Sequence, residues 1–150
     1  MHAPAKVIAA LVLTAWTTTS GQAQAHEIRQ GDYLLRSSTV ASERIDPATA
    51  AQHAIVPAAS RAVLNVLVLR HGGEAGTPIA AEVTASMQNL AGVRRDISLR
   101  EVKENGRVSY VGSYEFLPRE VIDFHITALP AGAEPDGMLK LSYRERMWRH

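Results

Sequence analysis

The sequence RAVLNVLVLR, residues Arg61–Arg70, decides the fold of this 150-residue chain. Seven of its ten residues are apolar, and an arginine stands at each end. In an extended chain successive side chains point to opposite faces of a sheet, and here both faces are apolar. The length of the run, its valine content and the lack of a preceding capping residue favour a strand over a buried helix. We therefore predict that Arg61–Arg70 is the central strand of an all-β domain.

Six further stretches have the alternation of apolar and polar residues that is typical of strands. They cover residues 33–40, 78–87, 94–103, 107–116, 121–129 and 139–148. Residues 26–30 are polar and are predicted to form a loose arm. A short helix is predicted over Asp46–Ala54, because Asp46 is a good N-cap and Pro47 suits the first helical position. About seven antiparallel strands with one short helix near the N-terminus predict a β-sandwich.

The first 25 residues have the pattern of a secretory signal peptide. Lys6 supplies the positive charge, Val7 to Trp16 is apolar, and Ala23-Gln24-Ala25 provides small residues for cleavage. The apolar run is too short to cross a membrane, and the mature chain has no second one. We predict a cleavable signal peptide at 1–25, a single domain at 26–150 and a periplasmic location for the mature protein.

The predicted mature chain is electrically balanced and has no cysteine. Lys6 is the leader's only residue among Lys, Arg, Asp and Glu, so 15 basic and 15 acidic residues remain. A balanced chain without basic runs argues against nucleic-acid binding. Without disulfides, the stability of the domain must come from apolar packing and backbone hydrogen bonds, which a domain of this size can supply.

An ordered series of short motifs resembles one bacterial family. The motifs are Gly31-Asp32-Tyr33, Asp46-Pro47, Asn65-Val66-Leu67-Val68, Pro78-Ile79-Ala80-Ala81-Glu82-Val83, Asn89-Leu90-Ala91-Gly92, Arg100-Glu101-Val102-Lys103-Glu104, and Tyr110 with Tyr114 and Phe116. In this order, over nearly the whole mature chain, they are similar to the bacterial periplasmic family catalogued as domain of unknown function 4426. The resemblance implies a single secreted immunoglobulin-like sandwich. It implies no reaction, so it assigns no catalytic residue.

Aromatic residues flank a glycine in the predicted strand 107–116. Tyr110, Tyr114 and Phe116 share a face with Gly112. They could line a shallow ligand groove, but such residues more often fill a sandwich core, and the glycine then marks a bulge or a close backbone approach. We interpret these residues as core.

One alternative function starts from His26, the first residue of the predicted mature chain. Its α-amino group and imidazole form a chelate suited to Cu(II), and secreted β-sandwich copper proteins use such a terminus. Asp123 and His125 stand two residues apart in a predicted strand, so they project from one face. The alternative prediction is a periplasmic copper-binding protein with His26, Asp123 and His125 as metal ligands. The plainer interpretation is that His125 is a solvated strand residue and His26 only marks the cleavage position.

The leading prediction is a non-catalytic binding or accessory module. The chain has no cysteine nucleophile and no G-x-S-x-G elbow, and no carboxylate pair can be assigned to catalysis. No catalytic residue and no cofactor are therefore predicted, with copper kept only for the alternative. The expected partner is an unidentified periplasmic protein or envelope component; no nucleic acid and no transmembrane segment in the mature chain are expected. The contact surfaces expected are Asp46–Ala54, His71–Thr77 and Pro130–Gly137.

Overall fold

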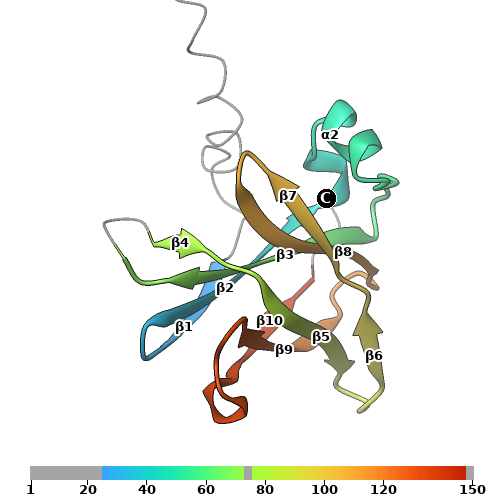
Figure 1. The fold of residues 1–150 in the computed structure, drawn as a ribbon. Helices are drawn as coiled ribbons and strands as arrows, with labels where there is room; N and C mark the ends of the chain where they lie inside the picture. The colour runs from blue at the N-terminus through green and yellow to red at the C-terminus, as the bar shows by residue number, and fades with distance from the viewer. Residues whose placement is uncertain (1–24, 73–75, 148–150) are drawn as a thin grey trace, which may run out of the picture.

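The computed structural model describes residues 25–72 and 76–147 (Figure 1). Its ten strands are β1 Ala25–Gln30, β2 Tyr33–Ala41, β3 Arg61–Arg70, β4 Thr77–Pro78, β5 Ala81–Asn89, β6 Arg94–Ile97, β7 Arg100–Glu104, β8 Arg107–Glu115, β9 Val121–Pro130 and β10 Leu139–Arg146. The helical elements in this part of the chain are α2 (Pro47–Gln52) and the 3₁₀ turns η2 (Ser42–Arg44) and η3 (Pro135–Gly137). The predicted signal peptide lies outside the described residues, apart from Ala25.

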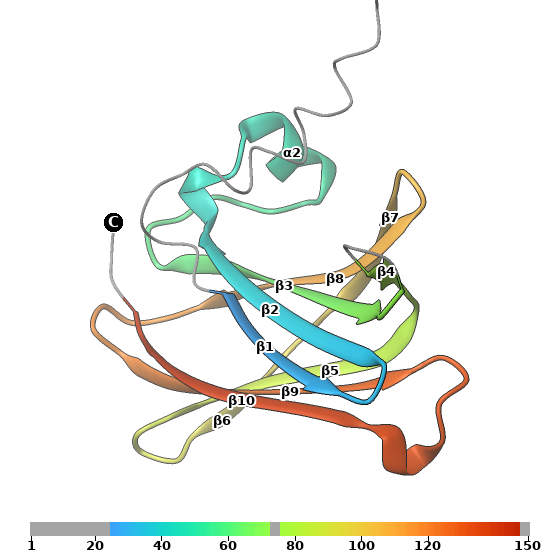
Figure 2. The ribbon, with the colours of Figure 1, turned by 90° about the vertical axis from the view of Figure 1, so that its left-hand side faces the viewer.

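The strands form two antiparallel sheets that face each other (Figure 2). One sheet has the order β1-β2-β3-β8-β7, with the short β4 pairing with the end of β3. The other sheet has the order β10-β9-β5-β6. A single apolar core fills the space between the sheets. The predicted all-β sandwich is confirmed, with ten strands in the described ranges instead of about seven.

The strand β3 has the bounds and the central place that its sequence predicts. It pairs with β2 on one side and with β8 on the other. Leu64, Val66 and Val68 point into the core and are fully buried. Val63 and Leu69, on the opposite face, are buried as well. Figure 2 shows the α2 segment above this face near the start of β3, while Leu69 at the other end pairs with Pro78 of β4.

Residues 26–30 do not form the loose arm that their polarity predicts. They belong to β1, which pairs with β2 over its whole length through the turn at Gly31. Gly31 has a φ of +58°, a conformation that glycine adopts without strain. The strand also lies against β10 of the other sheet. Only Ile28 in this segment carries an aliphatic side chain, so β1 is held mainly by backbone pairing and by polar contacts.

The charged stretch 94–103, predicted as one strand, divides into two. β6 pairs with β5, and β7 pairs with β8, so the chain passes from one sheet to the other at Ser98 and Leu99. At this passage the backbone crosses close to Gly112 of β8. A Cβ atom at Gly112 would lie 2.3 Å from the carbonyl oxygen of Ser98. The glycine therefore marks a close backbone approach, and not a ligand groove.

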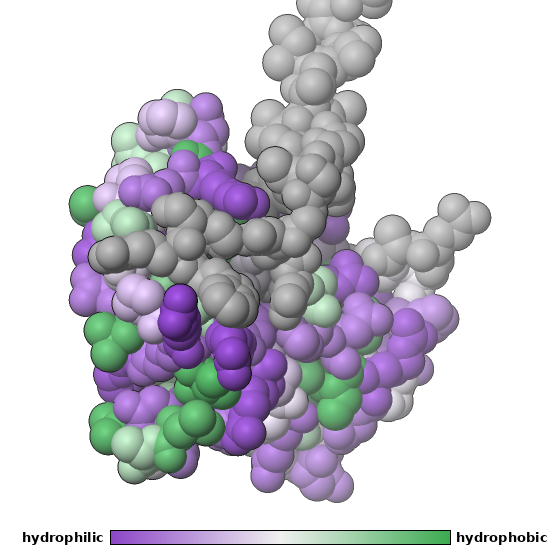
Figure 3. All heavy atoms as spheres, turned by 180° about the vertical axis from the view of Figure 1, so that it is seen from behind, coloured by the Kyte–Doolittle hydropathy of each residue, from purple (hydrophilic) through white to green (hydrophobic). Residues whose placement is uncertain are grey.

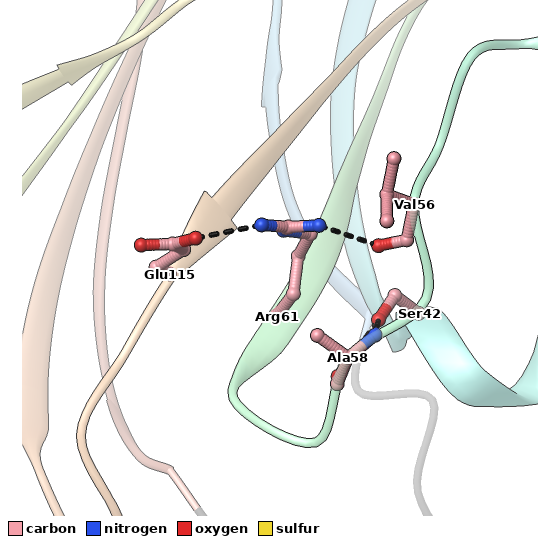
Figure 4. A network of polar contacts seen from close by, with 5 residues as sticks. All are labelled: Ser42, Val56, Ala58, Arg61 and Glu115. Atoms are coloured by element: carbon pink, nitrogen blue, oxygen red, sulfur yellow. Dashed lines mark hydrogen bonds and ion pairs between the residues drawn. The ribbon is translucent and has the colours of Figure 1, made fainter.

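The segment between β2 and β3 contains the predicted short helix. Asp46 caps α2, because its carboxylate accepts hydrogen bonds from the backbone N–H groups of Ala48 and Thr49. The hydroxyl of Ser42 exchanges two hydrogen bonds of 2.9 Å with the backbone of Ala58 (Figure 4). These contacts hold the segment close to the start of β3 and fix its position over the sheet.

The middle of the core is aromatic. Phe124 of β9 is fully buried, and its ring lies 5.4 Å from the ring of Tyr114 and 5.1 Å from that of Tyr143. Tyr110 and Phe116 are also buried, which confirms that the aromatic stripe of β8 belongs to the core. In the described ranges, no helix is long and apolar enough to cross a membrane.

Candidate functional site

The structure separates the three residues predicted as metal ligands. His26 of β1 turns its side chain into the space between the sheets, where its Nε2 lies 3.0 Å from Oε1 of Glu145. Asp123 and His125 alternate along β9 with the core residues Ile122 and Phe124, so they lie on the outer face of the same sheet. His26 and the Asp123–His125 pair therefore lie on opposite faces. The predicted set of three ligands is not assembled.

His26 belongs instead to a group of polar residues between the sheets, which we call the inter-sheet cluster. Its members come from β1, β2 and β10. They are His26, Ser37, Thr39, Tyr143 and Glu145. The cluster forms because β1 and β2, at one edge of their sheet, lie opposite β10, the edge strand of the other sheet.

Contacts within the inter-sheet cluster hold the His26 ring in one orientation. The imidazole stacks on the ring of Tyr143, with the ring centroids 3.9 Å apart and the planes 10° from parallel. Its Nε2 contacts Glu145, whose other carboxylate oxygen accepts a hydrogen bond of 3.5 Å from Thr39. The Tyr143 hydroxyl lies 2.8 Å from the hydroxyl of Ser37. The imidazole of His26 is therefore held by stacking on one face and by a polar contact at Nε2.

Burial decides the charge state of the tyrosines around this cluster. Burial raises the pKa of Tyr143 well above its usual range. The hydrogen bond between Tyr143 and Ser37 lowers this pKa, and the negative charge of Glu145 raises it. Burial and the charge of Glu145 also raise the pKa of Tyr114. Both tyrosines therefore stay neutral.

On the outer face of the same sheet, Asp123 and His125 each bind a neighbour on β10. Arg144 donates two hydrogen bonds, of 2.6 and 2.9 Å, to the carboxylate of Asp123. These bonds lower the pKa of Asp123, so it remains an ionised partner of arginine. His125 Nδ1 lies 3.0 Å from the hydroxyl of Ser142. Across residues 25–72 and 76–147, no three His, Cys, Asp or Glu side chains are grouped so that they could hold a metal ion.

A cleft of about 500 Å³ opens beside the α2 segment. Its walls include Arg61, Met87, Arg95, Tyr114 and Glu115. Figure 4 shows that Arg61 bridges Glu115 and the carbonyl oxygen of Val56, with both distances 2.7 Å. The guanidinium of Arg61 is therefore held by two partners within the protein, which makes it less available to a ligand in the cleft.

Three large apolar side chains are exposed on connections at the same end of the sandwich, and we call them the apolar tip. Leu90 (67% exposed) and Val93 (55%) lie on the turn between β5 and β6, and Leu117 (70%) lies on the connection between β8 and β9. An ion pair of 3.7 Å joins Arg95 of β6, two residues after Val93, to Glu120 on the β8–β9 connection. In Figure 3, which shows the molecule from behind, apolar side chains gather at the lower left, where the β5–β6 turn lies.

The apolar tip is not on the surfaces that the sequence predicts for binding. Pro130–Gly137 displays small and polar residues, and residues 73–75 of the predicted His71–Thr77 surface lie outside the described residues. The predicted surface Asp46–Ala54 has no large apolar residue, and Val56, two residues beyond it, is exposed. Leu90 lies inside the turn signal Asn89–Gly92, and this was the available clue to the apolar tip, since loops run over the surface and rarely bury their central side chains.

Several solved structures resemble this chain, and the following are three of them. A DUF4426 family protein (PA0388) from Pseudomonas aeruginosa matches with a TM-score of 0.71 and 22% identity, over 84% of this chain and 96% of that one. FetP from uropathogenic E. coli, expressed in the periplasm, matches with a TM-score of 0.59 and 12% identity, over 85% and 96% of the two chains. A copper-bound variant of FetP gives 0.60 and 12%, over 86% and 98%. At these identities the likeness shows a common fold.

Sequence comparison gives the family directly. Among curated proteins, none matches the sequence significantly. The family model described as "Domain of unknown function (DUF4426)" matches residues 27–149, which is almost the whole predicted mature chain. This match agrees with the resemblance that the ordered motifs carry, and with the fold shared with the Pseudomonas protein. The chain belongs to the DUF4426 family.

Proposed function

We propose that the mature chain is a secreted periplasmic module that binds an envelope protein and catalyses no reaction. One observation carries the proposal, namely the apolar tip formed by Leu90, Val93 and Leu117. Large apolar residues gathered on adjacent loops of a soluble domain are typical of protein contact surfaces. The rigid sheets behind the two connections hold these side chains in place for a partner.

The edges of the sheets are less suited to binding a partner strand. Charged residues are exposed along the edge strand β7, and they are Arg100, Glu101, Lys103 and Glu104. On β10 the exposed residues Lys140, Arg144 and Arg146 alternate with buried ones. Charges on edge strands oppose the addition of another strand. The apolar tip is therefore favoured over the edges as the contact surface.

Secretion is supported by the sequence pattern and by the comparisons. Residues 1–25 have the charged, apolar and small-residue regions of a signal peptide. FetP, which shares the fold, was expressed in the periplasm. A cysteine-free domain whose stability rests on apolar packing folds independently of the redox state of its compartment. Cleavage after Ala25 would leave His26 as the first residue.

The absence of catalysis is supported by how the reactive groups are placed. His125 and Ser142 lie within hydrogen-bond distance, but on the exposed outer face of a sheet. The nearby Asp123 is bound by Arg144 and does not orient the imidazole. A serine nucleophile requires an oriented base in a site that excludes water, and this face provides neither.

Polar replacement of the apolar tip is expected to release the partner. We predict that wild-type protein, extracted gently with its native envelope, migrates in native electrophoresis within a larger complex. The double variant Leu90→Ser, Leu117→Ser is predicted to migrate as the free chain, because the partner would lose its main apolar contact. Both side chains are exposed, so the free energy of unfolding should change by less than about 0.5 kcal/mol for each substitution.

The matched control is Lys140→Ser, an exposed change on β10 at the opposite end of the sandwich. It is predicted to leave the complex intact. If the double variant and the control both remain in the complex, the apolar tip is not the contact surface. If the wild-type protein itself migrates as the free chain in every extract, the proposed binding role is wrong.

A further inference from the structure

The contact between His26 and Glu145 uses one of the two imidazole nitrogens. Nε2 of His26 faces the carboxylate at 3.0 Å, so the hydrogen on this nitrogen is the one that Glu145 accepts. In the neutral imidazole this arrangement places the lone pair on Nδ1. A carboxylate that accepts from one ring nitrogen while the other nitrogen binds a metal is a recurrent arrangement around metal-binding histidines.

We propose that the mature N-terminus binds Cu(II) through the α-amino nitrogen and Nδ1 of His26, with Glu145 as the positioning residue. The inference depends on cleavage after Ala25, which is part of the proposed secretion. It does not depend on the apolar tip. Amine and imidazole nitrogens are donors that Cu(II) prefers, and both belong to one residue. Both donors of the chelate therefore come from β1.

The surroundings of His26 provide the second observation. The side chain of Glu145 is only 8% exposed, and that of His26 is 29% exposed. A buried carboxylate is unfavourable without a hydrogen-bonded partner, and His26 supplies that partner. The stacked ring of Tyr143 restricts the imidazole further. The imidazole of His26 is thus held in one orientation before any metal arrives, and such pre-organisation lowers the cost of binding.

This site differs from the ligand set that the sequence suggested. Asp123 and His125 lie on the outer face of the sheet and take no part in it. In this site His26 supplies both nitrogen donors, and Glu145 contributes by positioning the imidazole. FetP, which binds copper in one of the compared structures, shares the fold at 12% identity, and the argument here rests on His26 and Glu145 alone.

The test uses untagged protein isolated from the periplasm. Intact mass first establishes that the chain begins at His26. Titration with Cu(II) against a competing chelator then measures affinity, and electron paramagnetic resonance identifies the donors. We expect one Cu(II) per chain with a two-nitrogen signature. A form that keeps Gln22–Ala25 in front of His26 retains the imidazole but loses its terminal amine, and should bind at least about 100-fold more weakly.

Two further variants separate positioning from ligation. Glu145→Gln should weaken binding by about 10- to 100-fold while the two-nitrogen signature persists, because both donors remain. The matched change Glu115→Gln, at an exposed glutamate that pairs with Arg61, should leave the affinity unchanged. His125→Ala should also leave it unchanged. If Glu145→Gln does not fold, the form with the retained residues still tests the chelate.

Several outcomes would overturn the proposal. Equal Cu(II) affinity in the mature and extended forms would remove the α-amino group from the site. Loss of copper in His125→Ala would return the site to the outer face of the sheet. A mature mass beginning at another residue would exclude the chelate while leaving the apolar tip untouched. Conversely, a chain that binds Cu(II) but forms no larger complex would overturn the partner proposal only.

Discussion

Replacing Phe124 with alanine is expected to lower the free energy of unfolding by about 3–5 kcal/mol. The side chain is fully buried at the centre of the core, and its ring contacts those of Tyr114 and Tyr143 from two other strands. Removing the Phe124 ring opens a cavity between the two sheets. The backbone of β9 is fixed by pairing with β10 on one side and with β5 on the other, so the core cannot collapse to fill the cavity. Urea unfolding followed by circular dichroism measures the loss.

Two controls define the result for Phe124. Phe124→Leu retains most of the apolar volume and should lose less than about 1.5 kcal/mol. Leu117→Ala, a truncation on the exposed connection between β8 and β9, should change stability by less than about 0.5 kcal/mol. A loss below about 1 kcal/mol for Phe124→Ala would show that this ring does not stand at the centre of the packed core.

Replacing Gly112 with alanine is the second large change, with an expected loss of about 3 kcal/mol, at the upper end for overpacked sites. The added Cβ would meet the carbonyl oxygen of Ser98 at 2.3 Å, and the side chain of Leu99 at 3.0 Å. The first of these atoms belongs to the backbone, and it lies where the chain passes between the sheets. Removing this clash therefore requires a movement of β8 or of the connection between β6 and β7.

Gly72→Ala is the matched control for this substitution. Gly72 is exposed, a Cβ there meets nothing within 4 Å, and its φ is outside the positive range. We expect its stability to change by less than about 0.5 kcal/mol. Comparable urea midpoints for Gly112→Ala and Gly72→Ala would mean that the passage does not approach β8 so closely.

Most of the fold could be predicted from the sequence because its strands carry their own pattern. Arg61–Arg70 is apolar on both faces, and the structure gives it partners on both sides and buried residues on both faces. The polar β1 could not be predicted in this way, because its position depends on β2 and β10 and not on its own apolar residues. The division into β6 and β7 occurs where Ser98 and Leu99 cross close to Gly112, and no local sequence pattern predicts this contact.

The candidate site could be predicted only in part. His26 attracts attention because of its place at the predicted cleavage point, but its partner Glu145 is 119 residues away in the chain. A usable signal was present, since inward alternation along β10 continues from Leu141 and Tyr143 to Glu145. Which face of which sheet His26 approaches depends on how the two sheets meet, and sequence spacing does not contain this information.

The two proposed functions lie at the same end of the molecule. Ile122 of β9 pairs with Glu145 of β10 on one side and with Asn89 of β5 on the other. The turn that carries Leu90 follows Asn89 directly. A partner bound to the apolar tip would therefore lie near the mature N-terminus, although neither proposal requires the other.

The central claim, that this chain acts by binding through the apolar tip, is tested most directly by crosslinking inside the periplasm. A photoreactive amino acid is placed at position 90 in one strain and at position 140 in another, since Lys140 is also exposed but lies at the opposite end. The account predicts one dominant crosslinked protein at position 90 and none at position 140. Equal products at both positions, or none at position 90, would contradict it.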